Sequence, residues 1–78
     1  MKYKKELIRW VDSKSVADGW TPIEDVFNES LGVIETLGFV VAENKESVVV
    51  VGTIAPTDHV IQGIMVPKVC IKSRRLVR

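Results

Sequence analysis

A chain of 78 residues has room for one domain, so we expect residues 1–78 to form a single folded unit. Hydrophobic residues make up 46% of the chain and charged residues 27%, a composition typical of globular proteins and not of disordered ones. Its apolar runs are too short to cross a bilayer and no signal-peptide pattern opens it, which predicts a cytoplasmic protein without a membrane partner.

The chain offers few groups for chemistry. Cys70 is its one cysteine and His59 its one histidine, so it lacks both an internal disulfide and the usual zinc ligands. No glycine-rich loop precedes a helix in a pattern that would cradle phosphate. We therefore expect no metal and no small-molecule cofactor.

The first third of the chain predicts one strand, a loop and a short helix. Residues 3–12 alternate loosely, with Ile8 and Trp10 on one side and Leu7 and Val11 on the other, which favours a strand, with a short helix as the alternative. Residues 13–19 are polar and end in Asp-Gly, a turn signal. Thr21 as N-cap, Pro22 at the first helical position and Glu24 to complete a capping box predict a helix over 22–29.

The remainder predicts four more strands separated by short turns. They cover residues 31–42, 47–54, 60–66 and 69–76, and Pro67-Lys68 separates the last two strands. Gly38 lies within the longest strand, where glycine allows a bulge, a sharp bend or a close backbone approach.

Five strands and one short helix between the first two predict a mainly β protein, a small SH3-like or Sm-like barrel. A closed barrel removes exposed sheet edges. The alternative is an open meander with the helix packed on one face.

Two features favour self-assembly. The runs Val48 to Val51 and Gly38 to Ala42 are apolar on both faces of their strands, so another subunit is expected to cover the outer face. The ends of the chain are basic and residues 21–46 are acidic, which suits a head-to-tail contact between neighbours. Alternatively, the helix and the N-terminal segment cover that face in a monomer.

Candidate catalytic groups are sparse, and we predict no enzyme. Asp58-His59 is the one acid–imidazole neighbour pair, yet no motif places a nucleophile beside it, and Asp58 is expected to support a turn. Glu24 and Asp25 are consecutive on the predicted helix and do not share a face. Cys70 is expected to pack as a small hydrophobe.

A nucleic-acid site is the other candidate. Trp10 and Trp20 are residues on which a base stacks, although the simpler interpretation puts Trp10 in the core and Trp20 against the helix start. If the first and last strands pair, five cations gather into a patch suited to phosphate: Lys4, Arg9, Lys72, Arg74 and Arg75. A solvated face or an electrostatic subunit contact explains the same patch.

Scattered positions carry a resemblance. They are Trp10-Val11-Asp12-Ser13, Gly19-Trp20, Gly38-Phe39, Glu43, Val66-Pro67-Lys68, Ile71 and Leu76. The pattern resembles small uncharacterised proteins encoded by phages and prophages. The strand pattern also resembles Sm-like RNA-binding proteins, in which a bent second strand contains a glycine.

The Sm-like resemblance implies an RNA site in which Asn44 stands in the loop after the second strand. That family carries an Arg-Gly pair later in the chain, whereas this sequence has Gln62-Gly63. We therefore predict a non-enzymatic, self-assembling interaction module, phage- or prophage-associated, with a single-stranded RNA or DNA binder as the alternative.

Overall fold

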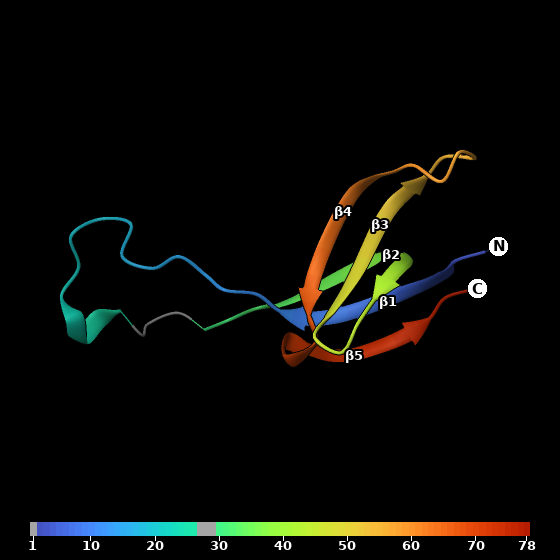
Figure 1. Cartoon of the computed structure of the whole chain (residues 1–78). Helices are drawn as coiled ribbons and strands as arrows, with labels where there is room; N and C mark the ends of the chain where they lie inside the picture. Colours follow the sequence, from blue (N-terminus) through green and yellow to red (C-terminus); the bar gives the residue numbers. More distant parts are fainter. Residues whose placement is uncertain (1, 27–29) are drawn as a thin grey trace.

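The computed structural model describes residues 2–26 and 30–78 and is mainly β-structure (Figure 1). Two short 3-10 turns, η1 and η2, accompany five strands. The elements in chain order are β1 (Lys4–Val11), η1 (Ile23–Asp25), β2 (Val33–Glu43), β3 (Ser47–Ile54), β4 (Val60–Pro67), η2 (Lys68–Cys70) and β5 (Ile71–Leu76). The five predicted strands are confirmed.

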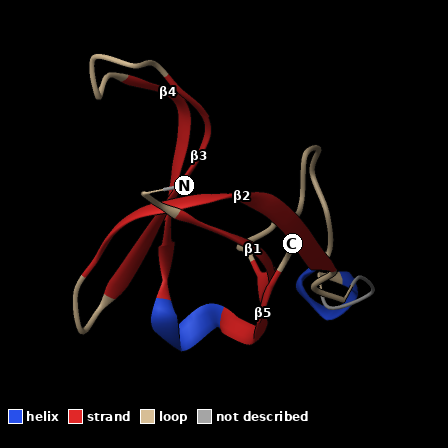
Figure 2. Ribbon diagram, turned by 90° about the vertical axis from the view of Figure 1, so that its right-hand side faces the viewer, coloured by secondary structure: helices blue, strands red, loops and turns tan. Residues whose placement is uncertain are grey.

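The strands form one antiparallel sheet in the order β4-β3-β2-β1-β5. Each strand from β1 to β3 pairs with the next strand in the chain, and β5 pairs with the other edge of β1. The β3–β4 hairpin rises away from β1 and β5, so the sheet is strongly curved (Figure 2).

The bend of β2 is located at Gly38, where two backbones come close together. A Cβ atom on Gly38 would lie 2.6 Å from the carbonyl oxygen of Val51 and 2.8 Å from Cγ1 of Val50. The predicted close approach is therefore confirmed. A register shift between Val40 and Ala42 adds to the bend.

The curvature folds one end of the sheet over the other and creates a small core. Its buried side chains come from β1 (Ile8, Trp10), β3 (Val48, Val50) and β4 (Val66). Cys70 packs against this cluster from η2, as the prediction of a small hydrophobe requires. Trp10 is 4% exposed and donates from Nε1 to Thr36 Oγ1 at 2.9 Å, which confirms its place in the core.

The prediction of a closed barrel is wrong. Among the described residues, β4 pairs only with β3 and β5 pairs only with β1, and the two strands diverge from η2 (Figure 1). The centre of β5 is charged and polar, from Lys72 to Arg75. Charged side chains of this kind are typical of an edge strand that stays unpaired.

The predicted helix over residues 22–29 is also not found. Over the described residues 22–26 the chain forms only η1, Pro22 stands at its N-cap position with no side-chain cap, and Thr21 Oγ1 donates instead to the Gly19 carbonyl at 2.9 Å. Residues 27–29 lie outside the described residues. A helix this short needs tertiary packing, and Ile23 is 86% exposed.

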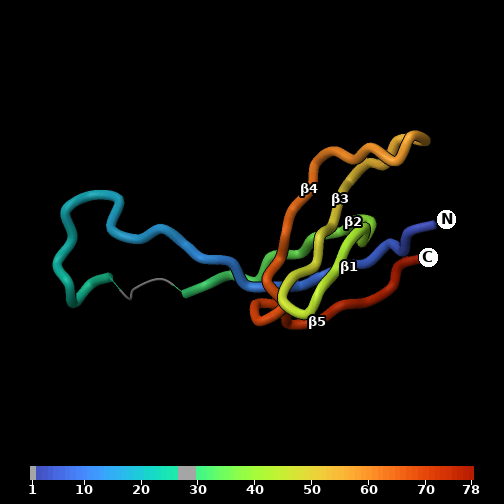
Figure 3. The backbone as a smooth tube through the Cα atoms, in the orientation of Figure 1, coloured from blue at the N-terminus to red at the C-terminus, as the bar shows by residue number. Residues whose placement is uncertain are grey.

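Residues 12–32 connect β1 to β2, and we call them the arm. Its described part, residues 12–26 and 30–32, makes a long excursion away from the sheet (Figure 3). Trp20 is fully exposed, so its predicted packing against a helix start is wrong. The arm stretches the molecule to 52 × 22 × 22 Å, with a radius of gyration of 16.1 Å. A compact domain of this length has a radius of gyration of about 11.5 Å.

The Val48 to Val51 run does not need the cover that its sequence suggests. Val48, Val50 and Val51 are at most 1% exposed within the single chain, and Val49 is half-buried. The curvature of the sheet buries both sides of β3. The exposed apolar side chains lie elsewhere.

We expect Gly38→Ala to destabilise the fold by about 1–3 kcal/mol, because the added methyl meets a backbone oxygen that cannot move without unbending the sheet. Urea unfolding followed by circular dichroism measures the change. Gly32→Ala is the matched control: a Cβ there meets nothing within 4 Å, so a change of about 0.5 kcal/mol or less is expected. Equal stability of the two variants would contradict a close approach at Gly38.

Candidate functional site

The pairing of β1 with β5 brings the predicted cations together but divides them between two faces. Glu6 lies opposite Leu76, and Ile8 lies opposite Arg74, so Arg74 projects to the core side of the sheet. Arg9 and Arg75 lie on the outer side. Lys72 is the extra residue at the register shift between Arg9 and Trp10.

Arg74 is held by two carboxylates. Its Nε and Nη2 donate to Glu6 at 2.8 and 3.0 Å, and its Nη1 and Nη2 donate to Glu43 at 2.9 Å each. Lys68 Nζ lies 2.7 Å from the same Glu43 carboxylate. We call Glu6, Glu43, Lys68 and Arg74 the charge cluster.

The charge cluster links four elements across the open side of the sheet. It joins β5 to β1, to the end of β2 and to η2, and the Lys68 amide donates to the Glu46 carbonyl at 2.7 Å. Hydrogen bonds from Arg74 and Lys68 lower the pKa of Glu43 to about 2. Those carboxylates in turn raise the pKa of Arg74 above its usual value. Arg74 is thus bound within the chain.

The other predicted binding residues occupy varied positions. Trp10 is buried, and Asn44 Oδ1 accepts from the amides of Glu46 and Ser47 at 2.8 Å each, which fixes the β2–β3 turn. Arg9 Nε lies 3.8 Å from Glu35 Oε2 on the outer face. Lys4 is exposed at the start of β1. Nucleic-acid binding by these residues stays a prediction.

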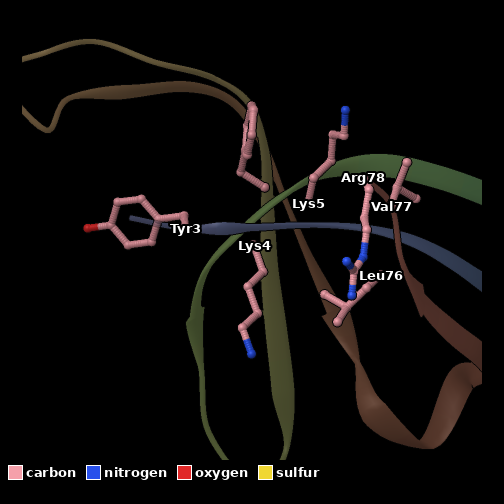
Figure 4. Close-up of a pocket in the computed structure, with 7 residues that line it drawn as sticks. Tyr3, Lys4, Lys5, Leu76, Val77 and Arg78 are labelled. Carbon is pink, nitrogen blue, oxygen red and sulfur yellow. The ribbon is translucent and has the colours of Figure 1, made fainter. Parts of the chain in front are cut away.

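A pocket lies at the end of the sheet where the two termini meet. It has a volume of about 420 Å³, within the usual range for ligand pockets. Its lining, which we call the end pocket, consists of Tyr3, Lys4, Lys5, Phe39, Leu76, Val77 and Arg78. Figure 4 shows Lys4 and Lys5 projecting to opposite sides of β1, with Leu76, Val77 and Arg78 beside them.

The end pocket combines cations with apolar side chains. Lys4, Lys5 and Arg78 supply positive charge, no acidic residue lines it, and Tyr3 and Phe39 supply aromatic surface. The Val77 amide donates to the Lys5 carbonyl at 2.9 Å, which extends the β1–β5 ladder and fixes this corner. The arrangement suits a ligand that is both anionic and apolar.

Sequence reasoning found only Lys4 among the end-pocket residues. The predicted pairing of the first and last strands was the available signal, because it places residues 3–5 beside residues 76–78. The charge cluster was missed because the basic ends and the acidic middle were expected to meet between neighbours. Instead, several of these charges meet inside one chain.

The Asp58-His59 pair belongs to the β3–β4 turn. The Asp58 amide donates to the Ala55 carbonyl at 3.0 Å, and its backbone has a φ of +61°, so Asp58 supports the turn as predicted. Its carboxylate lies 3.2 Å from Lys2 Nζ, and His59 Nδ1 lies 3.1 Å from both oxygens of Thr57. The nearest partners of both side chains are turn and terminal residues.

Within residues 2–26 and 30–78, no three histidine, cysteine or carboxylate side chains gather to hold a metal ion. Nor does any helix in that part of the chain have the length and apolar character to span a membrane. Comparison with protein-family models, curated proteins and solved structures found no match.

We expect Glu43→Gln to lower the melting temperature at pH 7, because Arg74 and Lys68 lose their shared anion. The folded-state pKa of about 2 lies below the ordinary value of 4.5. The stabilisation is therefore complete above pH 4.5 and is lost as the pH falls toward 2.

Melting curves recorded by circular dichroism between pH 7 and pH 2 test this. The difference between wild type and Glu43→Gln should shrink over the acid range. Glu46→Gln, an exposed change in the β2–β3 turn, serves as the control. A difference that stays constant down to pH 2 would show that Glu43 is not the titrating anion.

Proposed function

We propose that this protein is a non-enzymatic, self-assembling interaction module whose partner is a second copy of the chain. The observation that carries the proposal is the amount of surface that a single chain leaves in water. The phage or prophage association and the cytoplasmic location stay predictions from the sequence.

The accessible surface is 6270 Å². A compact monomer of 8.7 kDa exposes about 4,700 Å² by the usual scaling of surface with mass. The excess is therefore about 1,500 Å², close to the area that one chain buries in two contacts of about 800 Å² each. Assembly of copies through two contacts per chain would bring the surface to the compact value.

The number of exposed apolar side chains also supports self-assembly. Among the described residues, six large hydrophobic side chains are buried and thirteen are exposed. The exposed ones fall mainly on the arm, on β2 and along β4. Exposed apolar surface on this scale is typical of an interaction site.

The free edge of β4 adds support. Edge strands that stay unpaired commonly carry charges, and β5 does, through Lys72, Arg74 and Arg75. By contrast, β4 (VIQGIMVP) contains no charged residue and exposes Ile61 and Met65. An uncharged edge of this kind is normally covered in the working assembly.

We expect light scattering on a size-exclusion column to give a mass that is a multiple of 8.7 kDa at micromolar concentration. Since assembly stabilises only the folded chain, the melting temperature should rise with protein concentration. A clean monomer with a concentration-independent melting temperature would overturn the proposal.

A nucleic-acid binder is the second candidate, and the end pocket favours it. Tyr3 and Phe39 lie beside Lys4, Lys5 and Arg78, and single-stranded nucleic acids are bound by aromatic faces set among cations. The charge cluster argues against the patch first predicted, because Arg74 is occupied by carboxylates.

Titration of a fluorescent single-stranded oligonucleotide at several salt concentrations separates the two candidates. A nucleic-acid site gives binding that weakens steeply as salt rises, and Lys5→Glu then reduces it. Lys45→Glu, in the β2–β3 turn, matches the charge change away from the end pocket. Absence of binding at low salt would eliminate this candidate.

A further inference from the structure

We infer that the acidic arm of one copy docks into the basic end pocket of the next, so that the chains join head to tail. This inference rests on the proposed self-assembly and names its contact. Trp20 and Ile23 are the anchors, and the cations around the end pocket, Lys4, Lys5 and Arg78, receive the acidic residues of the arm.

The large apolar side chains of the described part of the arm lie mainly in solvent. Its apolar side chains Val16, Trp20, Ile23 and Leu31 are between 49% and 107% exposed. Even η1 buries none of its residues. A fully exposed tryptophan beside an exposed isoleucine has the character of an interface anchor, since such side chains dominate binding energy when a partner covers them.

The charge of the arm is opposite to that of the end pocket. Residues 12–32 contain five acidic residues and one lysine, for a net charge of −4. Three cations and no acidic residue line the end pocket. Complementary charge of this kind sets the orientation and raises the rate of association.

The dimensions agree as well. The end pocket has a volume of about 420 Å³, and Phe39 and Leu76 are among its lining residues, which suits an aromatic side chain. One side of a standard interface uses about 20–30 residues, and the arm alone is 21 residues long. One arm therefore provides nearly a full half of a stable contact.

The geometry favours a second copy over the arm's own chain. The arm leaves the sheet after Val11, whereas the end pocket surrounds residues 3–5 at the other end of β1, about 20 Å away along the strand. In Figures 1 and 3 the arm extends away from the two termini. Arm and pocket therefore lie at opposite ends of the long axis, where head-to-tail contacts form.

Two variants of the full chain test the contact. Trp20→Ser removes the anchor without removing a buried contact, and Lys5→Glu with Arg78→Glu reverses the charge of the pocket. We expect the dissociation constant, measured by sedimentation, to rise by about thirtyfold or more for the first and about tenfold or more for the second. Arg78→Glu alone, at the last residue, is the fallback if the double variant does not fold.

Matched controls lie outside both surfaces. Val69→Ser removes an apolar side chain that is 95% exposed on η2, and Lys45→Glu reverses a charge in the β2–β3 turn. Both should assemble as the wild type does.

Mixing the two variants gives the sharpest result. Trp20→Ser keeps a working pocket and the charge-reversed variant keeps a working arm. At concentrations where each alone is monomeric, an equimolar mixture should form a dimer and nothing larger. No other surface predicts this complementation.

The outcomes separate this inference from the proposed function. A monomeric wild type overturns self-assembly itself. An oligomeric wild type with an equally oligomeric Trp20→Ser overturns only the arm contact, and dissociation by Met65→Ser would then place the interface on β4. The arm contact is also overturned if the two monomeric variants fail to complement each other. The same holds if Trp20 is protected from acrylamide quenching in a monomeric sample, because it would then be covered within its own chain.

Discussion

The fold depends on the close approach of two backbones at Gly38. With a carbonyl oxygen 2.6 Å from where a Cβ would lie, only glycine allows β2 to bend over β3 at this point. The bend carries Val48, Val50 and Val66 over Ile8 and Trp10, and these five side chains are the buried cluster. One sheet thereby supplies both layers of its own core, which is how so short a chain buries any side chains fully.

The same curvature brings the two ends of the sheet toward closure without completing it. Where a barrel would have a ladder between β4 and β5, this chain has the charge cluster, with Arg74 reaching Glu43 from across the sheet. Guanidinium and carboxylate groups keep part of their hydration, so this side stays open to water. The consequence is an asymmetric pair of edges: β5 is charged, and β4 is not.

Local pattern predicted what local interactions determine. The bounds of β3 and the turn before it follow from alternation and from an asparagine that bonds its own loop, and Gly38 identified the bend. The prediction of a helix over residues 22–29 was wrong because capping signals do not by themselves stabilise a short helix. Such a helix must pack on another surface, and the arm lies away from the sheet. The prediction of a closed barrel was wrong for a related reason, because closure depends on which charged residues, distant in sequence, come together in the fold.

The candidate site shows the same division. Pairing of the first and last strands was predictable, and it gathers the cations as expected. The pleat then sends alternate residues to opposite faces, so Arg74 meets Glu6 and Glu43 while Arg75 lies on the outer side. A list of cations along a strand does not contain the carboxylates that a neighbouring strand brings to them. Predicting the end pocket would have required the positions of both termini in the folded chain.

The polarity of the molecule limits how copies can join. The chain is basic where β1 begins and acidic where β1 leads into the arm, so its two ends differ in charge. A two-fold dimer that set arm against arm or pocket against pocket would oppose like charges, so a two-fold pair fits only if each arm reaches the pocket of the other copy. A head-to-tail contact pairs unlike charges at every junction. Such a contact repeats, and the rotation between successive copies then decides whether the series closes into a ring or continues as a filament.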